Sequence, residues 1–131
     1  MKKTWPVLLV LILSFWAIRP LLTFGFFPIH DNTQVVRVQQ MASALQDGQF
    51  PVRWVRDLGY GYGYPLFNFY APLVYYVGAF FNLIGFNSLI ATKMMMGLGV
   101  LLAGVFMYFL AREFWGKIGG IAAALFYVYA Q

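Results

Sequence analysis

Long apolar runs alternate with one polar, aromatic segment along this chain of 131 residues. The apolar runs cover residues 5–24, 66–85, 88–111 and 117–131. A helix of roughly 20 apolar residues crosses a hydrocarbon core of about 30 Å, so the pattern predicts about four membrane-spanning helices, the last of them truncated. We therefore expect an all-α integral membrane protein, a multi-span helical bundle in which residues 1–131 form the N-terminal part of a single transmembrane domain.

The segment that interrupts these runs, residues 25–65, carries the pattern of one amphipathic helix between positions 31 and 47. Its apolar positions follow helical spacing, and they are Val35, Val38, Met41, Ala42 and Leu45. The remaining face carries Arg37, Gln39, Gln40, Ser43 and Asp47. Asp31 or Asn32 stands where an N-cap is expected and Gly48 where a C′ glycine is expected. We expect this helix to lie along the outer membrane surface.

Composition supports the membrane assignment and excludes several other classes. The chain is 62% hydrophobic and 10% charged, against roughly 45–50% apolar and 25% charged for soluble domains. The net charge is +5, but the nine basic residues are dispersed without a clustered basic face, so nucleic-acid binding is not expected. The absence of cysteine excludes disulfides, thiol nucleophiles and cysteine metal sites.

Basic residues beside the first apolar run predict the orientation of the chain. Lys2 and Lys3 precede this run, which places the N-terminus in the cytoplasm and residues 25–65 outside it. Arg112 and Lys117 would then fall outside together with the arginines of the loop, and this count is unfavourable. Membrane lipid is the expected surrounding of the apolar runs.

Three of the four acidic residues lie in the loop, so candidate chemistry concentrates there. His30 and Asp31 are adjacent just after the first apolar run, but one imidazole and one carboxylate make an incomplete site for a divalent cation. Asp31 fits either a helix N-cap or a catalytic carboxylate.

Cations and aromatic rings accompany this carboxylate. Arg37, Arg53 and Arg56 suit either a phosphate group or anionic lipid headgroups. The Gly/Tyr alternation at 59–65 supplies three rings, including that of Tyr64, which fit an aromatic belt at headgroup level or stacking on a sugar or lipid.

Sequence motifs over nearly the whole chain carry a resemblance to a known family. The motifs are Asp31-Asn32-Thr33-Gln34, Gly48-Gln49-Phe50-Pro51-Val52-Arg53-Trp54, Gly63-Tyr64-Pro65, Phe69-Tyr70-Ala71-Pro72-Leu73 and Tyr108-Phe109-Leu110-Ala111-Arg112-Glu113-Phe114-Trp115-Gly116. Their order resembles the start of the multi-spanning type C glycosyltransferases, which use polyprenyl-phosphate sugars. More closely, the chain resembles a bacterial membrane family labelled as related to 6-pyruvoyl-tetrahydropterin synthase, although one histidine gives no basis for pterin chemistry.

The resemblance implies transfer of a sugar from a polyprenyl-phosphate donor to an extracytoplasmic acceptor at the bacterial cytoplasmic (inner) membrane. Asp31 matches the acidic residue that acts as base or helps to bind a divalent cation, Mg²⁺ or Mn²⁺. His30 is the second candidate ligand because it adjoins Asp31, and it is not part of the general type C pattern. Asn32 departs from the pattern, because many relatives carry a second acid there. The residues expected to bind substrate are Arg37, Arg53, Arg56, Tyr64 and Tyr70. The alternative is a non-catalytic multi-pass membrane protein, such as a transporter-like or assembly subunit.

Overall fold

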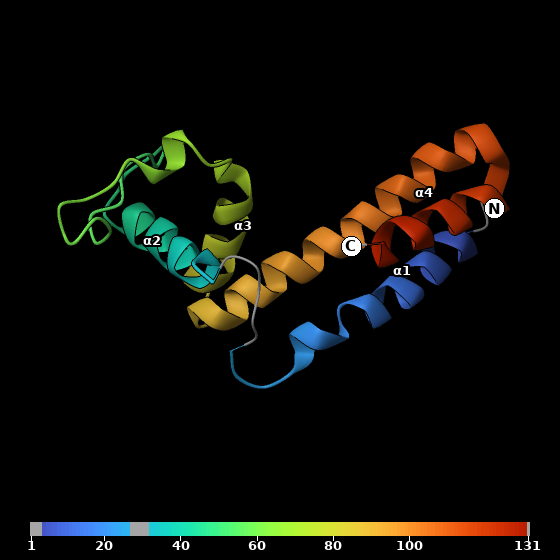
Figure 1. Cartoon of the computed structure of the whole chain (residues 1–131), viewed down its shortest axis with the longest axis horizontal. Helices are drawn as coiled ribbons and strands as arrows, with labels where there is room; N and C mark the ends of the chain where they lie inside the picture. The colour runs from blue at the N-terminus through green and yellow to red at the C-terminus, as the bar shows by residue number, and fades with distance from the viewer. Residues whose placement is uncertain (1–3, 27–31, 131) are drawn as a thin grey trace. The chain divides into compact units, whose positions relative to one another are not determined.

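The computed structural model describes residues 4–26 and 32–130, and this part of the chain is all-helical, as predicted. The helices are α1 (Trp5–Ala17), the 3-10 helix η1 (Arg19–Leu22), α2 (Gln34–Gln46), the 3-10 helix η2 (Leu66–Asn68), α3 (Pro72–Leu83) and α4 (Ser88–Tyr129) (Figure 1). Extended pairing within the described ranges is limited to one isolated antiparallel bridge between Val55 and Tyr64.

Helix lengths do not support the predicted bundle of about four spans. Of the helices in the described residues, α4 alone is long and apolar enough to cross a membrane. Helix α1 has 13 residues and α3 has 12, which at about 1.5 Å per residue reach about 20 Å at most, against a hydrocarbon core of about 30 Å. Pro72 is one physical reason, because the residue before a proline is driven out of the helical region and Ala71 has ψ 110°. The apolar run 66–85 therefore enters α3 only at Pro72.

Helix α4 contains the break that the sequence predicts between residues 111 and 117. Gly116 has φ 68° and ψ −170°, so residues 88–115 and 117–129 form two helical segments with a kink at this glycine. The second segment runs back along the first (Figure 1). A backbone with positive φ is accessible to glycine at little steric cost.

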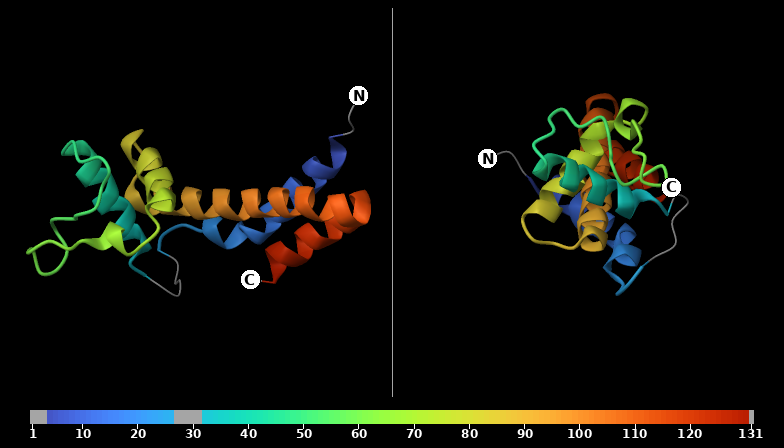
Figure 2. Two further views of the ribbon diagram at one scale, coloured as in Figure 1. Left: turned by 90° about the horizontal axis from the view of Figure 1, so that it is seen from above. Right: turned by 90° about the vertical axis from the view of Figure 1, so that its left-hand side faces the viewer.

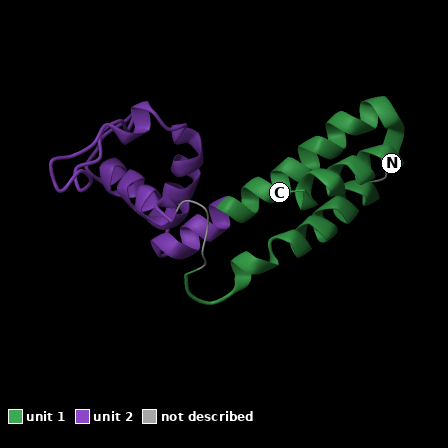
Figure 3. Cartoon of the chain, in the orientation of Figure 1, with its two compact units in different colours: residues 1–27, 96–131 green, residues 28–95 purple. Residues whose placement is uncertain are grey.

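The chain divides into two compact units (Figure 3). Unit 1 consists of Met1–Phe27 and Met96–Gln131, and unit 2 consists of Pro28–Met95. Each unit has its own packing.

In unit 1, α1 lies beside the two segments of α4, as Figure 1 and the left view of Figure 2 show. Val10 of α1, Tyr108 of the first segment and Ala124 of the second form the buried core. A Cβ added to Gly104 would lie 2.8 Å from the Ser14 hydroxyl oxygen and 3.0 Å from Val128 Cγ2. The helices thus meet through small residues, the packing mode common between membrane helices.

In unit 2, α2 packs on α3 through a close approach at Gly78. Val38 and Met41 of α2 are fully buried, and a Cβ at Gly78 would lie 2.6 Å from Val38 Cγ2. The chain turns at Gly48 after α2, with φ 80°.

The end of α2 follows the sequence prediction, whereas its start does not. The Gly48 N–H bonds the Leu45 carbonyl and the Gln49 N–H bonds the Ala44 carbonyl, both at 3.0 Å, which is the paired pattern of a glycine C′ cap. Thr33 occupies the N-cap without a side-chain cap hydrogen bond. The prediction of Asp31 or Asn32 at this position is wrong, because the chain makes a turn at Asn32 and Thr33 before the helix begins.

Candidate functional site

Asp31 and His30, the predicted catalytic and metal-binding residues, lie outside the described residues. Within residues 4–26 and 32–130, no group of three or more His, Cys, Asp or Glu side chains could hold a metal ion. The catalytic role of Asp31 and its use of a divalent cation stay predictions.

Arg37 and Tyr70, both predicted to bind substrate, are brought together by the fold. The guanidinium carbon of Arg37 lies 4.1 Å from the centroid of the Tyr70 ring. Its Nη1 donates a hydrogen bond to the Tyr75 hydroxyl at 3.3 Å, and this hydroxyl donates to Gln34 Oε1 at 2.8 Å. A buried cation needs such partners, because an uncompensated charge is costly to desolvate.

This arrangement corrects the predicted polar face of α2. Arg37 and Gln40 were expected on the exposed side, yet their exposed fractions are 8% and 7%. Arg37 is covered because it stacks on Tyr70, and Gln40 is held by a hydrogen bond from its Nε2 to Asp57 Oδ2 at 2.8 Å. Both partners come from the chain beyond α2, so polar character alone did not indicate solvent exposure.

Arg56 lies between two carboxylates. Its Nη1 is 2.9 Å from Asp47 Oδ2, and its Nε is 3.6 Å from Asp57 Oδ1. One guanidinium against two carboxylates leaves a local excess of one negative charge, which opposes a phosphate. The phosphate contact predicted for Arg56 stays a prediction, and the negative charge of the two neighbouring carboxylates disfavours it.

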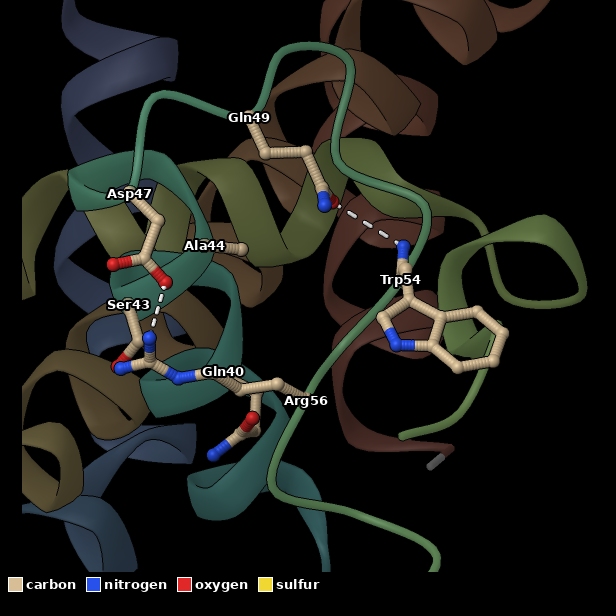
Figure 4. A pocket seen from close by; sticks show the side chains of 7 residues that line it. All are labelled: Gln40, Ser43, Ala44, Asp47, Gln49, Trp54 and Arg56. Atoms are coloured by element: carbon tan, nitrogen blue, oxygen red, sulfur yellow. Dashed lines mark hydrogen bonds and ion pairs between the residues drawn. The ribbon is translucent and has the colours of Figure 1, made fainter. Parts of the chain in front are cut away.

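A hollow with a volume of about 220 Å³ adjoins this ion pair (Figure 4). We call it the Trp54 hollow, and it is lined by Gln40, Ser43, Ala44, Asp47, Gln49, Trp54 and Arg56. Its shape depends on Gln49, whose Oε1 accepts hydrogen bonds from the backbone N–H of Arg53 at 3.0 Å and of Trp54 at 3.2 Å. The glycine turn that ends α2 thus places Gln49 where its side chain holds the backbone of residues 53 and 54.

The indole of Trp54 lies against the backbone of Gly63. A Cβ at residue 63 would overlap the indole nitrogen, and Gly63 has φ 84°. The neighbouring residues Val55 and Tyr64 exchange two backbone hydrogen bonds, at 2.9 and 2.8 Å, which hold the two segments together. Tyr64, a predicted substrate contact, is thereby fixed through its backbone while its side chain remains 42% exposed.

Arg53 borders a second hollow, with a volume of about 380 Å³. We call it the Arg53 hollow, and it is lined by Pro51, Val52, Arg53, Phe67, Asn68, Pro72 and Tyr76. The Tyr76 hydroxyl accepts a hydrogen bond from the Val52 N–H at 2.8 Å, which fixes this wall. Arg53 is exposed, and the described part of the chain gives its guanidinium no ion-pair partner. The hollow therefore combines an open cation with walls that include prolines and the rings of Phe67 and Tyr76.

Sequence reasoning did not assign a site role to Gln49, Trp54 or Tyr76. The regular glycines at 59, 61 and 63 were a usable signal for Trp54, since glycine often marks close approach of a backbone to another group. No local pattern indicated Tyr76, whose role depends on a backbone donor 24 residues earlier.

Comparison with protein-family models, curated proteins and solved structures found no match to this chain.

Proposed function

We propose that this chain belongs to a membrane glycosyltransferase of type C architecture, which transfers a sugar from a polyprenyl-phosphate donor to an extracytoplasmic acceptor. The observation that carries the proposal is the Arg53 hollow, in which one exposed guanidinium stands beside apolar and aromatic walls. A polyprenyl-phosphate donor joins a phosphate to an apolar chain, and this lining matches both parts. The sequence motifs that resemble the family supply the reaction type.

Each proposed role follows from ordinary chemistry. The Arg53 guanidinium would donate hydrogen bonds to the phosphate of the donor and stabilise the charge that grows on it as the leaving group departs. Asp31 would accept the proton of the acceptor hydroxyl, or bind Mg²⁺ or Mn²⁺ together with His30. Arg37 and Tyr70 form a fixed cation and aromatic pair that would support the substrate-binding wall.

The finer architecture is part of the same proposal. We place the protein in the bacterial cytoplasmic membrane as a multi-pass bundle, with α4 crossing the bilayer and the apolar runs of α1 and α3 contributing further helices. Support for the membrane comes from α4, which is long and apolar enough to cross it.

A transfer assay on membranes containing the intact gene product tests the proposal. The donors are polyprenyl-phosphate glucose, mannose and N-acetylglucosamine with labelled sugars, and the readout is label in the acceptor fraction. We expect Asp31→Asn to abolish transfer and Arg53→Ala to reduce it at least tenfold, with partial recovery in Arg53→Lys. Lys117→Ala, at the exposed reversal of α4, is the matched control and should retain transfer. Full transfer by a normally inserted Asp31→Asn protein would remove Asp31 from the mechanism, and no transfer by the wild-type protein from any of these donors would overturn the proposal.

A non-catalytic membrane subunit is the second candidate, favoured by the internal contacts of two loop arginines. Arg37 stacks on Tyr70, and Arg56 pairs with Asp47 and Asp57, so both already have structural roles. The wild-type protein would then give no transfer above that of host membranes with any of the three donors.

A further inference from the structure

We infer that the Trp54 hollow binds one neutral sugar ring of the acceptor. The binding of a sugar can be measured by itself, whereas its assignment to the acceptor rests on the proposed function.

Charge selects against an anionic ligand. Asp47 lines the hollow together with Arg56, and Asp57 lies beside Arg56 outside the lining, at 2.9 and 3.6 Å between the paired atoms, so two carboxylates already compensate the charge of this guanidinium. The hollow therefore offers a phosphate no net positive charge. A neutral ligand rich in hydroxyl groups needs no such charge.

The polar groups supply the alternation of donors and acceptors that sugar hydroxyls need. Each hydroxyl donates one hydrogen bond and accepts others. Gln49 uses its Oε1 on two backbone N–H groups, so its Nε2 amide group is the part that can donate to a ligand. Asp47 uses Oδ2 on Arg56, so Oδ1 can accept, and the Ser43 hydroxyl can do both.

These groups stand at opposite sides of the hollow. Figure 4 shows Ser43, Asp47 and Arg56 gathered at one side, with Gln49 and Trp54 at the other. Hydroxyl groups project around the rim of a sugar ring, so a ring placed between the two sides would reach both.

Trp54 supplies the apolar surface for the C–H face of the ring. Its exposed fraction is 48%, and its indole packs against Gly63, where it occupies the space that a Cβ would fill. A fixed aromatic ring binds with a smaller loss of side-chain entropy than a mobile one. Aromatic rings combine a large apolar face with, in tryptophan, an N–H donor at the edge.

Size limits the ligand to one ring. The hollow has a volume of about 220 Å³, below the roughly 300–1,000 Å³ of pockets that enclose drug-sized molecules. Further sugars of an acceptor chain would extend out of it.

Saturation-transfer difference NMR on the purified intact protein tests the inference, in a detergent without a sugar headgroup. The probes are the methyl glycosides of glucose, mannose, galactose and N-acetylglucosamine at millimolar concentration, with methyl phosphate and tetramethylammonium as charged comparisons. We expect ring-proton signals from at least one glycoside and none from methyl phosphate. Trp54→Ala should reduce this signal at least fivefold, and Trp54→Phe should retain part of it.

Two further variants separate binding from folding. Ser43→Ala removes one hydroxyl without disturbing the indole and should weaken the signal about twofold or more. Tyr60→Ala removes a fully exposed ring that does not line the hollow and should leave the signal unchanged. Absence of signal from every glycoside, an equal signal in Trp54→Ala, or a signal from tetramethylammonium alone would overturn the inference.

The transfer assay distinguishes failure of the sugar-binding inference from failure of the proposed function. With both correct, Arg53→Ala loses transfer but keeps glycoside binding, and Trp54→Ala raises the KM for acceptor more than it lowers kcat. Glycoside binding without any transfer would overturn the proposed function and the acceptor assignment, leaving a sugar-binding site. Transfer without glycoside binding would overturn only the sugar site.

Discussion

Arg37 of α2 donates a hydrogen bond across 3.3 Å to the hydroxyl of Tyr75, which lies on α3. The same hydroxyl donates to Gln34 Oε1 at 2.8 Å, so one phenol oxygen connects two polar side chains of α2 to the facing helix. The Phe67 ring packs against Tyr75 with 5.4 Å between the ring centroids. Tyr75 is thereby central to the α2–α3 contact.

Tyr75→Phe should destabilise unit 2 by about 1–3 kcal/mol. The substitution keeps the ring and its packing, but it removes the hydrogen bonds to the buried Arg37 and to Gln34. Thermal unfolding in detergent, followed by tryptophan fluorescence, measures the change. Tyr62→Phe is the matched control, because this ring is 89% exposed and its substitution should leave the unfolding temperature unchanged. Equal unfolding temperatures for the two variants would show that the buried network contributes nothing measurable.

Gly63→Ala should disrupt the loop more than Gly61→Ala does. Both residues have positive φ, 84° and 87°, so alanine meets a backbone cost of about 1–2 kcal/mol at each. Only at Gly63 would the added Cβ overlap the Trp54 indole, since Gly61 has nothing within 4 Å of that position. We expect a shift of the tryptophan emission, to which Trp54 contributes, and faster proteolysis around residues 54–64 in Gly63→Ala, and smaller effects in Gly61→Ala. Identical behaviour of the two variants would contradict the close contact.

Gly104→Ala should loosen the contact between α1 and α4, whereas Gly99→Ala should not. A Cβ added at residue 104 would lie 2.8 Å from the Ser14 hydroxyl oxygen. A Cβ added at residue 99 would have nothing within 4 Å. Forcing a methyl group into a packed contact costs typically about 1–3 kcal/mol. The thermal unfolding temperature should therefore fall in Gly104→Ala and stay constant or rise slightly in Gly99→Ala. A second variant, Ser14→Gly with Gly104→Ala, should recover part of the loss by restoring space.

Single cysteines test the orientation, and the chain has no native cysteine to confuse the result. With the proposed topology, Thr33→Cys should react with a membrane-impermeant maleimide on intact cells, and Phe86→Cys should react only after permeabilisation. Both positions are exposed, so access depends on the membrane side. Labelling at both positions in intact cells would show that α3 does not cross the bilayer. Labelling at 86 alone would invert the topology and contradict extracytoplasmic transfer.

Local signals in the sequence predicted the breaks in the fold well. Gly48 ends α2 and Gly116 divides α4, because each adopts a positive φ that few other residues tolerate. Apolar spacing also predicted the existence of α2. The length of the apolar runs overestimated α1 and α3, since apolar character continues through residues that do not adopt an α-helix, such as those of η1 and η2.

The candidate site was less accessible to sequence reasoning, because its contacts join distant positions. Arg37 is covered by Tyr70 and bonded to Tyr75, which lies 38 residues further along the chain. The Trp54 hollow exists because the glycine-rich turn returns Tyr64 to pair with Val55. Spacing along one helix carries no information about such partners.

Helix α4 has a practical consequence for work with parts of this molecule. The boundary between the two units falls between Met95 and Met96, within an uninterrupted helical segment that runs from residue 88 to 115. A cut at this boundary would expose unpaired backbone carbonyl and N–H groups at two new helix ends. Neither unit can therefore be excised there as an intact piece, and studies of the Trp54 hollow should keep residues 96–115 attached.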